Sequence, residues 1–255
     1  MTNPVKIIQI SDPHLVPRGG KVHGGDPFAK LAAAIADVNA HHGDAALVVV
    51  SGDLADAGER GAYDVLREAL ARLSPPFRLM AGNHDERALI REIFPETAAS
   101  DGGFLQDAID LPGLRIILLD TLDPGHVAGR LDAVRLRWLE EALAGAQGRP
   151  VHLFMHHPPF PLHMAEFDSL PLAGADALRD LVTRHGRVRH IHAGHVHRFV
   201  AGSWHDIPVS VTRSTSHQTA LRSGMGWTLG PERPGYAVIL VEAAGTIVHF
   251  HEIEA

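Results

Sequence analysis

A chain of 255 residues is long enough to bury a large core, and we expect a single domain over residues 1–255. The formal net charge of −7 provides no overall basic field, which disfavours a nucleic-acid polymer as a partner. The chain contains no cysteine, so disulfides, thiolate metal ligands and cysteine nucleophiles are excluded. Any metal must therefore be held by His, Asp, Glu or Asn.

The first residues, MTNPVKIIQIS, lack the charged lead, long apolar core and small-residue cleavage site of a secretory signal. Apolar runs along the chain stay short of the roughly 18 residues that a membrane span requires. We therefore predict a cytoplasmic protein that does not contact a membrane.

Short apolar runs that end in polar residues alternate with helical periodicity along most of the chain. Their length and β-branched content predict buried strands within residues 5–14, 46–53, 77–85, 114–121, 151–158 and 188–197. Spacing near 3.6 predicts helices within residues 26–40, 61–73, 86–94, 131–146 and 174–186. Asp26 is placed as the N-cap of the first helix, with Pro27 at its first position.

This alternation indicates βαβ crossovers, a largely parallel sheet, and functional loops at the carboxyl ends of the strands. From about residue 197 onward, short apolar segments separated by turns predict antiparallel strands that finish a second sheet. The segment 213–233 shows no clear period, and we expect a functional loop there.

Polar clusters follow five of the predicted strands: SDPH, SGD, GNHD, MHHPP and GHVH. Residues two apart in an extended chain point to the same side, so His195 and His197 can present two imidazoles to one point. Each cluster alone has a structural alternative, such as a turn, a capped loop or a pair of surface histidines. Together they favour a metal site. The strand ends supply eight candidate residues, Asp12, His14, Asp53, Asn83, His84, His156, His195 and His197, and two metals that share a carboxylate could use seven of them.

The ordered motifs DPH, GD, GNHD, HH and GHVH resemble the signature of the calcineurin-like metallophosphoesterases and extend over residues 12 to 197. The stretches GDLADAGERGAY, LDTLDPGH, MHHPPFPL and IPVSVTRSTSHQ resemble the bacterial class III cyclic-nucleotide phosphodiesterases and the glycerophosphodiesterases. The resemblance implies an α/β fold, a four-layer αββα sandwich of two mixed β-sheets flanked by helices, with a dimetal centre at one edge.

The resemblance also implies a role for each matched residue. It makes Asp12, His14 and His197 ligands of a first metal, usually iron, and Asn83, His156 and His195 ligands of a second, usually Mn, Zn or Co, with Asp53 as the bridge.

Three further histidines match positions that contact substrate in the family. His84 is implied to be catalytic, through contact with the phosphate or the leaving group, and His217 and His126 match substrate-contacting histidines. We expect His157 to turn away from the metals, because it neighbours His156 on a strand. Asp85 either orients His84 or begins the next helix.

The predicted function is dimetal-dependent hydrolysis of small phosphodiesters, either 3′,5′-cyclic nucleotides or glycerophosphodiesters, by attack of metal-activated hydroxide on phosphorus. A phosphomonoesterase with the same dimetal centre is the alternative, and a scaffold without activity is disfavoured because all seven ligand positions are filled. The expected partner is a small-molecule phosphodiester, and a homodimer formed through 213–233 is left open.

Overall fold

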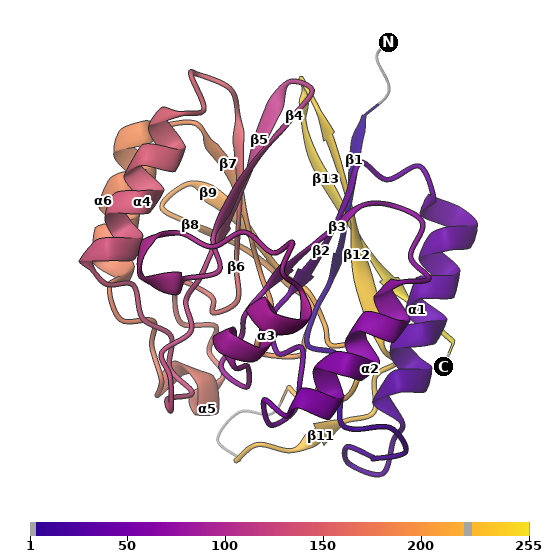
Figure 1. Ribbon diagram of the computed structural model, residues 1–255. Coiled ribbons are helices and arrows are strands. Elements are labelled where there is room, and N and C mark those ends of the chain that lie inside the picture. Colours follow the sequence, from indigo (N-terminus) through magenta and orange to yellow (C-terminus); the bar gives the residue numbers. More distant parts are fainter. Residues whose placement is uncertain (1–3, 222–225, 255) are drawn as a thin grey trace.

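Two mixed β-sheets pack face to face in the computed structural model, which describes residues 4–221 and 226–254 (Figure 1). The first sheet has the order β13-β12-β1-β2-β3. Its parallel strands are β1 (Val5–Ile10), β2 (Leu47–Ser51) and β3 (Phe77–Met80), and its antiparallel strands are β12 (Gly235–Glu242) and β13 (Gly245–Glu252). All five residues of β2 are buried, as expected for a strand covered on both faces.

The second sheet has the order β4-β5-β6-β7-β9-β8. Its strands are β4 (Asp107–Leu111), β5 (Leu114–Leu119), β6 (Val151–Met155), β7 (Val188–Ala193), β8 (Val200–Trp204) and β9 (Ile207–Val211). Strands β5, β6, β7 and β9 run parallel, whereas β4 and β8 pair antiparallel at the two edges. In each sheet the parallel strands therefore end at one shared edge, where the loops that follow them lie close together.

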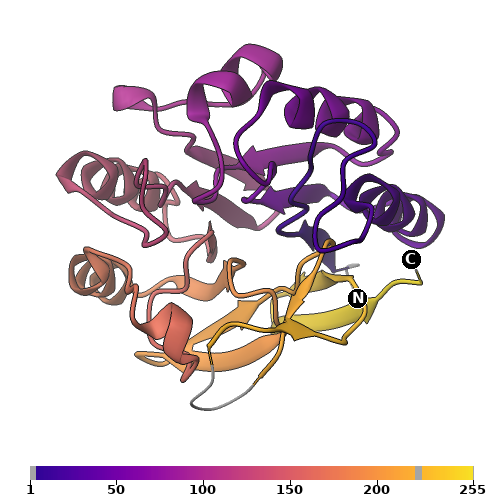
Figure 2. The same cartoon turned by 90° about the horizontal axis from the view of Figure 1, so that it is seen from below.

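Helices cover the outer faces of both sheets (Figures 1 and 2). The first sheet is covered by α1 (Pro27–His42), α2 (Arg60–Leu70) and α3 (Arg87–Ile93), and the second by α4 (Ala133–Ala144) and α6 (Ala175–His185), while α5 (Ala165–Asp168) is a short turn of helix after β6. In α1 the buried residues Leu31, Ala34, Ile35 and Val38 follow the spacing of one helical face. Among the apolar clusters that result, two lie beneath the helices, one lies between the sheets, and a small fourth one includes Ala193 and Val211, so the predicted four-layer αββα arrangement is confirmed.

Most of the elements lie where the sequence predicts them. Each of the six predicted strands contains an observed one, and Asp26 accepts a hydrogen bond from the amide of Ala29 at the start of α1. The prediction that the later strands all finish the second sheet is wrong for β12 and β13, which pair beside β1 in the first sheet. Hairpin periodicity does not determine which sheet edge a hairpin joins.

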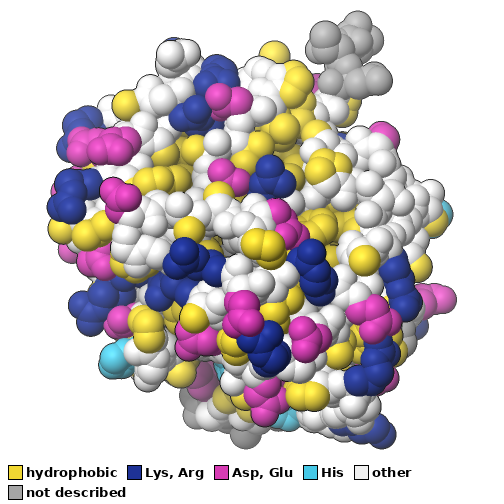
Figure 3. Space-filling view, in the orientation of Figure 1, with side chains coloured by type: hydrophobic (Ala, Val, Ile, Leu, Met, Phe, Trp, Pro, Cys, Tyr) yellow, Lys and Arg dark blue, Asp and Glu magenta, His cyan; other side chains and the backbone are white. Residues whose placement is uncertain are grey.

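The segment 213–233 contains only the two-residue strands β10 (Gln218–Thr219) and β11 (Leu229–Gly230), and residues 222–225 of that predicted loop lie outside the described residues. None of the helices in the described part of the chain is long and apolar enough to cross a bilayer. Basic and acidic side chains are interspersed on the face shown in Figure 3.

A polar connection joins the two sheets inside the sandwich. Gln9 on β1 donates to the hydroxyl of Ser51 on β2 (2.9 Å) and to the carbonyl of Ala193 on β7 (3.0 Å). The hydroxyl of Thr212, after β9, donates to Oε1 of Gln9 (2.8 Å). This buried amide therefore fixes the first sheet against the second, close to the strand ends that carry the motifs.

Three buried histidines also lie between the sheets, away from the motifs. The rings of His190 and His192 on β7 stack with centroids 4.2 Å apart, and His152 on β6 lies 5.3 Å from His192. The hydroxyl of Ser210 contacts His190 and His192, and Thr246 on β13 contacts His152. Burial lowers the pKa of His152 to about 3 and that of His190 to about 4, so these rings stay neutral in the folded protein at neutral pH.

These histidines predict a loss of stability in mild acid. Each takes up a proton in the unfolded chain below its ordinary pKa of 6.5 and stays neutral in the folded one. The free energy of unfolding should therefore fall by about 2 kcal/mol per histidine between about pH 7.5 and about pH 5. Urea unfolding at the two pH values should show a smaller fall for His152→Gln than for the parent.

The control is His205→Gln, in the turn between β8 and β9, where the side chain is exposed. This variant removes an exposed histidine and no buried one, so its free energy of unfolding should depend on pH as that of the parent does. An equal fall in His152→Gln and the parent would contradict the assignment of acid sensitivity to this cluster.

Candidate metal centre

The carboxyl ends of five strands meet at one edge of the sandwich and carry the residues singled out by the sequence. Asp12 follows β1, Asp53 follows β2, Asn83 follows β3, His156 follows β6 and His195 follows β7. The amide of His195 donates to the carboxylate of Asp12 (3.0 Å), and His156 Nδ1 lies 2.9 Å from the carbonyl oxygen of Ser51. Both contacts connect the two sheets, so the fold itself brings the motifs together.

One group of buried side chains contains the predicted ligands of the first metal. Asp12, His14, Asp53 and His197 each place one ligand atom within 4.8 Å of the others. Nε2 of His14 lies 3.0 Å from Nε2 of His197, and Nε2 of His197 lies 3.4 Å from Oδ1 of Asp12. Two imidazole nitrogens that face each other at this distance beside carboxylates form a donor set suited to a cation.

A second group adjoins the first through Asp53. Oδ2 of Asp53 lies 3.5 Å from Nε2 of His14 and 3.3 Å from Nε2 of His156. Nε2 of His156 lies 3.3 Å from Oδ1 of Asn83, and the ring of His195 lies 5.2 Å from the ring of His156. One carboxylate oxygen is thus adjacent to both groups.

The electrostatics of these groups follow from burial and pairing. Burial acts to raise the pKa of Asp53, but His156 and His14 outweigh it and hold that pKa well below its ordinary value. The converse holds for His156, where burial is outweighed by Asp53 and Asp12 and the pKa rises to about 9. Carboxylates kept ionised in a buried site are suited to a cation.

Two further observations show that the residues fit metal ions. Nε2 of His195 is buried without a hydrogen-bond partner among the described residues, which is costly unless another group binds it. Positive φ angles occur at five of the seven predicted ligands: Asp12, His14, Asp53, His195 and His197. Such backbone strain in non-glycine residues persists mainly where function requires it. The donor set of imidazole nitrogens with carboxylate and amide oxygens fits two divalent cations.

Gly52 and Gly82 leave the space that the proposed ligands His156 and Asp53 occupy. A Cβ at Gly52, whose φ is +98°, would lie 2.4 Å from Nδ1 of His156. A Cβ at Gly82 would lie 2.2 Å from Oδ1 of Asp53 and 2.3 Å from its amide nitrogen. Glycine in GD and GNHD is therefore required by the close approach of the loops, in addition to any freedom in φ.

His84 and His217 both lie beside the first group. The amide of His84 donates to Oδ1 of Asp53 (3.0 Å), and its ring centroid lies 4.7 Å from that of His14. Desolvation acts to lower the pKa of His84, whereas Asp53 and then Asp56 act to raise it, and the net shift is upward. The ring of His217 lies 4.9 Å from His14 and 4.4 Å from His197, so the structure brings this histidine to the centre.

The structure does not bring His126 to the centre. Its side chain is exposed, and Nδ1 lies 3.2 Å from the carbonyl oxygen of Pro124 and 3.5 Å from the carboxylate of Asp123, within its own loop. His157 is buried, and its two ring nitrogens contact the hydroxyl of Thr121 (2.7 Å) and the carbonyl of Val127 (3.0 Å). Because both nitrogens have protein partners, His157 is a poor metal ligand despite its position beside His156.

Asp85 has a role that differs from both of the roles expected from the sequence. Its carboxylate accepts hydrogen bonds from the Tyr63 hydroxyl and from three backbone amides, those of Leu54, Ala55 and Gly82. It therefore ties together the loops that carry Asp53 and Asn83. The N-cap of α3 is Glu86, so the expectation that Asp85 begins the helix is corrected, while the alternative that it orients His84 stays a prediction.

Asp56 is a second residue that the motifs did not indicate. Its Oδ1 lies 3.0 Å from Nδ1 of His14, and its carbonyl oxygen lies 2.6 Å from Nδ1 of His84. A carboxylate behind a metal-binding histidine fixes the tautomer and the orientation of the ring. The sequence feature that could have indicated Asp56 is its position three residues after Asp53, on the same loop.

Comparison with known proteins agrees with this geometry. A family model described as calcineurin-like phosphoesterase matches residues 5–199. A probable cyclic nucleotide phosphodiesterase of Rhodopseudomonas palustris is 39% identical over 96% of this chain and 91% of its own length. The glycerophosphodiester phosphodiesterase GpdQ of Enterobacter lignolyticus is 32% identical over 83% of this chain and 78% of its own length.

A solved structure shares the fold at low sequence identity. The dimetal phosphatase of Danio rerio superposes with a TM-score of 0.71 at 17% identity, and the match covers 99% of this chain and all of that one. The two-sheet arrangement is therefore found in proteins whose sequences have diverged widely.

The close approach at Gly82 predicts that a single methyl group disrupts the centre. Gly82→Ala should lower the affinity for Mn²⁺ by at least about tenfold, since displaced supporting contacts cost metal sites about 10- to 100-fold. Titration calorimetry with Mn²⁺ measures this effect without any substrate. Gly245→Ala, where a Cβ would meet nothing within 4 Å, is the matched control. Unchanged affinity in Gly82→Ala would show that this loop does not position Asp53.

Proposed function

The chain belongs to the calcineurin-like phosphoesterase family, and from this premise we propose that it hydrolyses small phosphodiesters, either 3′,5′-cyclic nucleotides or glycerophosphodiesters. The observation that carries the proposal is the position of Asp53, whose Oδ2 lies within 3.5 Å of imidazole nitrogens from both groups. A carboxylate in that position suits a bridge between two metals.

The proposed ligands divide between two metals. Asp12, His14 and His197 would hold the first, Asn83, His156 and His195 would hold the second, and Asp53 would contribute to both. Imidazole with carboxylate and amide oxygen accepts iron at the first position and Mn, Zn or Co at the second, as the family resemblance implies. The unpartnered Nε2 of His195 supports its place in this set.

A pair of bound metal ions would supply hydroxide at neutral pH, because a metal can lower the pKa of water to about 7, and would offset charge on the phosphoryl oxygens. The protein contributes the geometry. Asp56 and Asp85 are positioning residues, the first behind His14 and the second behind the loops that carry Asp53 and Asn83.

His84 is the proposed general acid for the leaving alkoxide. Its Nδ1 is held by the carbonyl oxygen of Asp56 at 2.6 Å, which leaves Nε2 for the substrate. His84 also follows Asn83 directly, so a phosphodiester held at the centre lies close to this ring. A proton supplied here matters most when the leaving group is a poor one.

The comparison of a diester with a monoester tests the proposed function. The Mn²⁺-reconstituted protein should show a kcat/KM for bis(p-nitrophenyl) phosphate at least about tenfold above that for p-nitrophenyl phosphate. Treatment with EDTA should remove the activity. A preference for the monoester would assign the protein as a phosphatase, and absence of metal-dependent turnover of both substrates would overturn the enzyme assignment.

If His84 is the general acid, the loss of kcat on its removal should depend on the leaving group. His84→Ala should lower kcat about 10²- to 10⁴-fold on a diester with an alkoxide leaving group, and much less on a p-nitrophenyl diester, whose leaving group needs no proton. His41→Ala, an exposed change at the end of α1, is the control. Equal losses on both substrates would contradict the role of His84 as an acid.

A further inference from the structure

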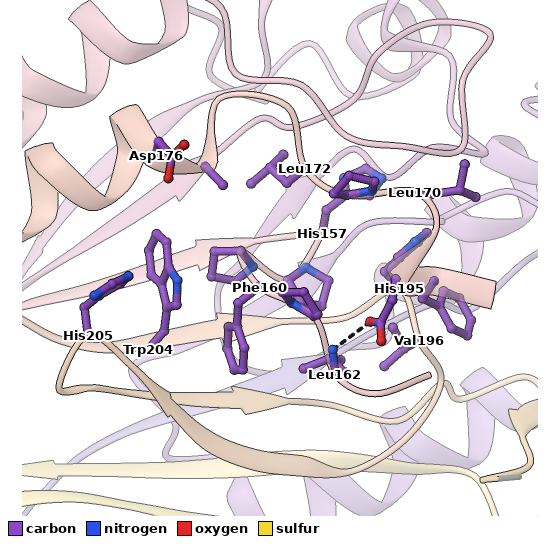
Figure 4. A pocket seen from close by; sticks show the side chains of 17 residues that line it. His157, Phe160, Leu162, Leu170, Leu172, Asp176, His195, Val196, Trp204 and His205 are labelled. Atoms are coloured by element: carbon purple, nitrogen blue, oxygen red, sulfur yellow. Dashed lines mark hydrogen bonds between the residues drawn. The ribbon is translucent and has the colours of Figure 1, made fainter. Parts of the chain in front are cut away.

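A cavity of about 260 Å³ borders the proposed metal centre, because the proposed ligand His195 lines it (Figure 4). Most of its wall comes from residues 157–172, the segment that follows β6, and the rest from the ends of β7, β8 and α6. His195 and Val196 lie at one end, and Trp204 and His205 lie at the other. The cavity therefore begins at a proposed ligand of the second metal and leads away from it.

The wall of the cavity is apolar and rich in flat surfaces. It contains three aromatic side chains, Phe160, Phe167 and Trp204, and four prolines between residues 158 and 171. The ring of Phe167 packs edge-on against the ring of His195, with centroids 5.2 Å apart. A group bound in the cavity is consequently close to the metal centre and faces aromatic and proline surfaces.

Two carboxylates line the cavity, those of Asp168 and Asp176, and the side chain of Asp176 is 91% exposed. Oδ1 of Asp168 accepts a hydrogen bond from the amide of Leu162 at 2.7 Å, which fixes the carboxylate in place (Figure 4). A carboxylate is an acceptor for the N–H of an amino group. The combination of flat apolar walls with one fixed acceptor suits a heteroaromatic base that carries an exocyclic amine.

We propose that this cavity binds the nucleobase of a 3′,5′-cyclic nucleotide whose phosphate lies at the metal centre. The inference rests on the proposed phosphodiesterase function and specifies its substrate class. Phe160 and the prolines stack on the base, and Asp168 accepts from its amino group. A glycerol moiety would leave its hydroxyl groups without partners against the same walls, so the cavity selects for cyclic nucleotides over glycerophosphodiesters.

A second aromatic surface near the centre is the competing location for a base. Trp227 is 42% exposed, and its ring lies 5.2 Å from His23 and 6.1 Å from His217. The cavity is favoured because it encloses a base on several sides, whereas Trp227 offers one open face. Substitution at each location distinguishes the two.

The test compares cyclic AMP with the 3′,5′-cyclic phosphate of 1-deoxyribose, which lacks only the base. The parent should prefer cyclic AMP in kcat/KM by at least about tenfold, as expected when one base stacks on aromatic side chains. Ala175→Phe fills the cavity from the first turn of α6 and should raise KM for cyclic AMP about tenfold while leaving the abasic substrate within about twofold.

Three further variants keep the test decisive if Ala175→Phe is unstable. Phe160→Ala removes an aromatic wall and should also raise KM for cyclic AMP selectively. Ala177→Phe places the same ring two residues along α6, at an exposed position that does not line the cavity, and should behave as the parent. Trp227→Ala should likewise leave KM for cyclic AMP unchanged.

The outcomes separate this inference from the proposed function. Metal-dependent hydrolysis with equal kcat/KM for the two substrates would overturn the base-binding cavity but keep the phosphodiesterase. Activity on glycerophosphodiesters without activity on cyclic AMP would do the same. A rise in KM in Trp227→Ala and not in the cavity variants would move the base to Trp227. Inactivity of the parent on every diester would overturn the proposed function itself.

Discussion

The buried carboxylate of Asp53 is the feature on which the rest of the site depends. Its Oδ2 lies within 3.5 Å of ring nitrogens of His14 and His156, while Oδ1 accepts from the amide of His84. A carboxylate with under 2% exposure is costly to keep ionised unless cations surround it. Imidazoles keep this group ionised, while a glycine that leaves room and the loops fixed by Asp85 hold it in position.

The two-sheet architecture explains how residues so far apart in the chain reach that carboxylate. Parallel strands place the loops after β1, β2 and β3 at one edge of the first sheet, and those after β6 and β7 at the matching edge of the second. The amide of Gln9 joins Ser51 and Ala193 across the interior, and His195 donates to Asp12. The same contacts that align the sheets therefore set the positions of the ligands.

The sequence predicted the parts of this protein that depend on local pattern. Periodicity located the strands and helices, and the five motifs supplied the proposed ligands, most of which the structure brings together in buried groups of His and Asp. It could not assign β12 and β13 to a sheet, because strand order depends on contacts distant in sequence. It singled out Asp85 but not its role in joining two loops, and it missed Asp56, which contacts His14 and His84. It also missed the cavity, because its walls come from segments that are separate in the sequence.

The most direct test of the account is anomalous diffraction from crystals of the Mn²⁺-loaded protein, recorded at the manganese edge. The account predicts two peaks about 3.5–4 Å apart at the carboxyl edge of the sheets, with the carboxylate of Asp53 between them. A single peak, or two peaks of which only one contacts Asp53, would contradict the bridging carboxylate on which the proposed chemistry rests.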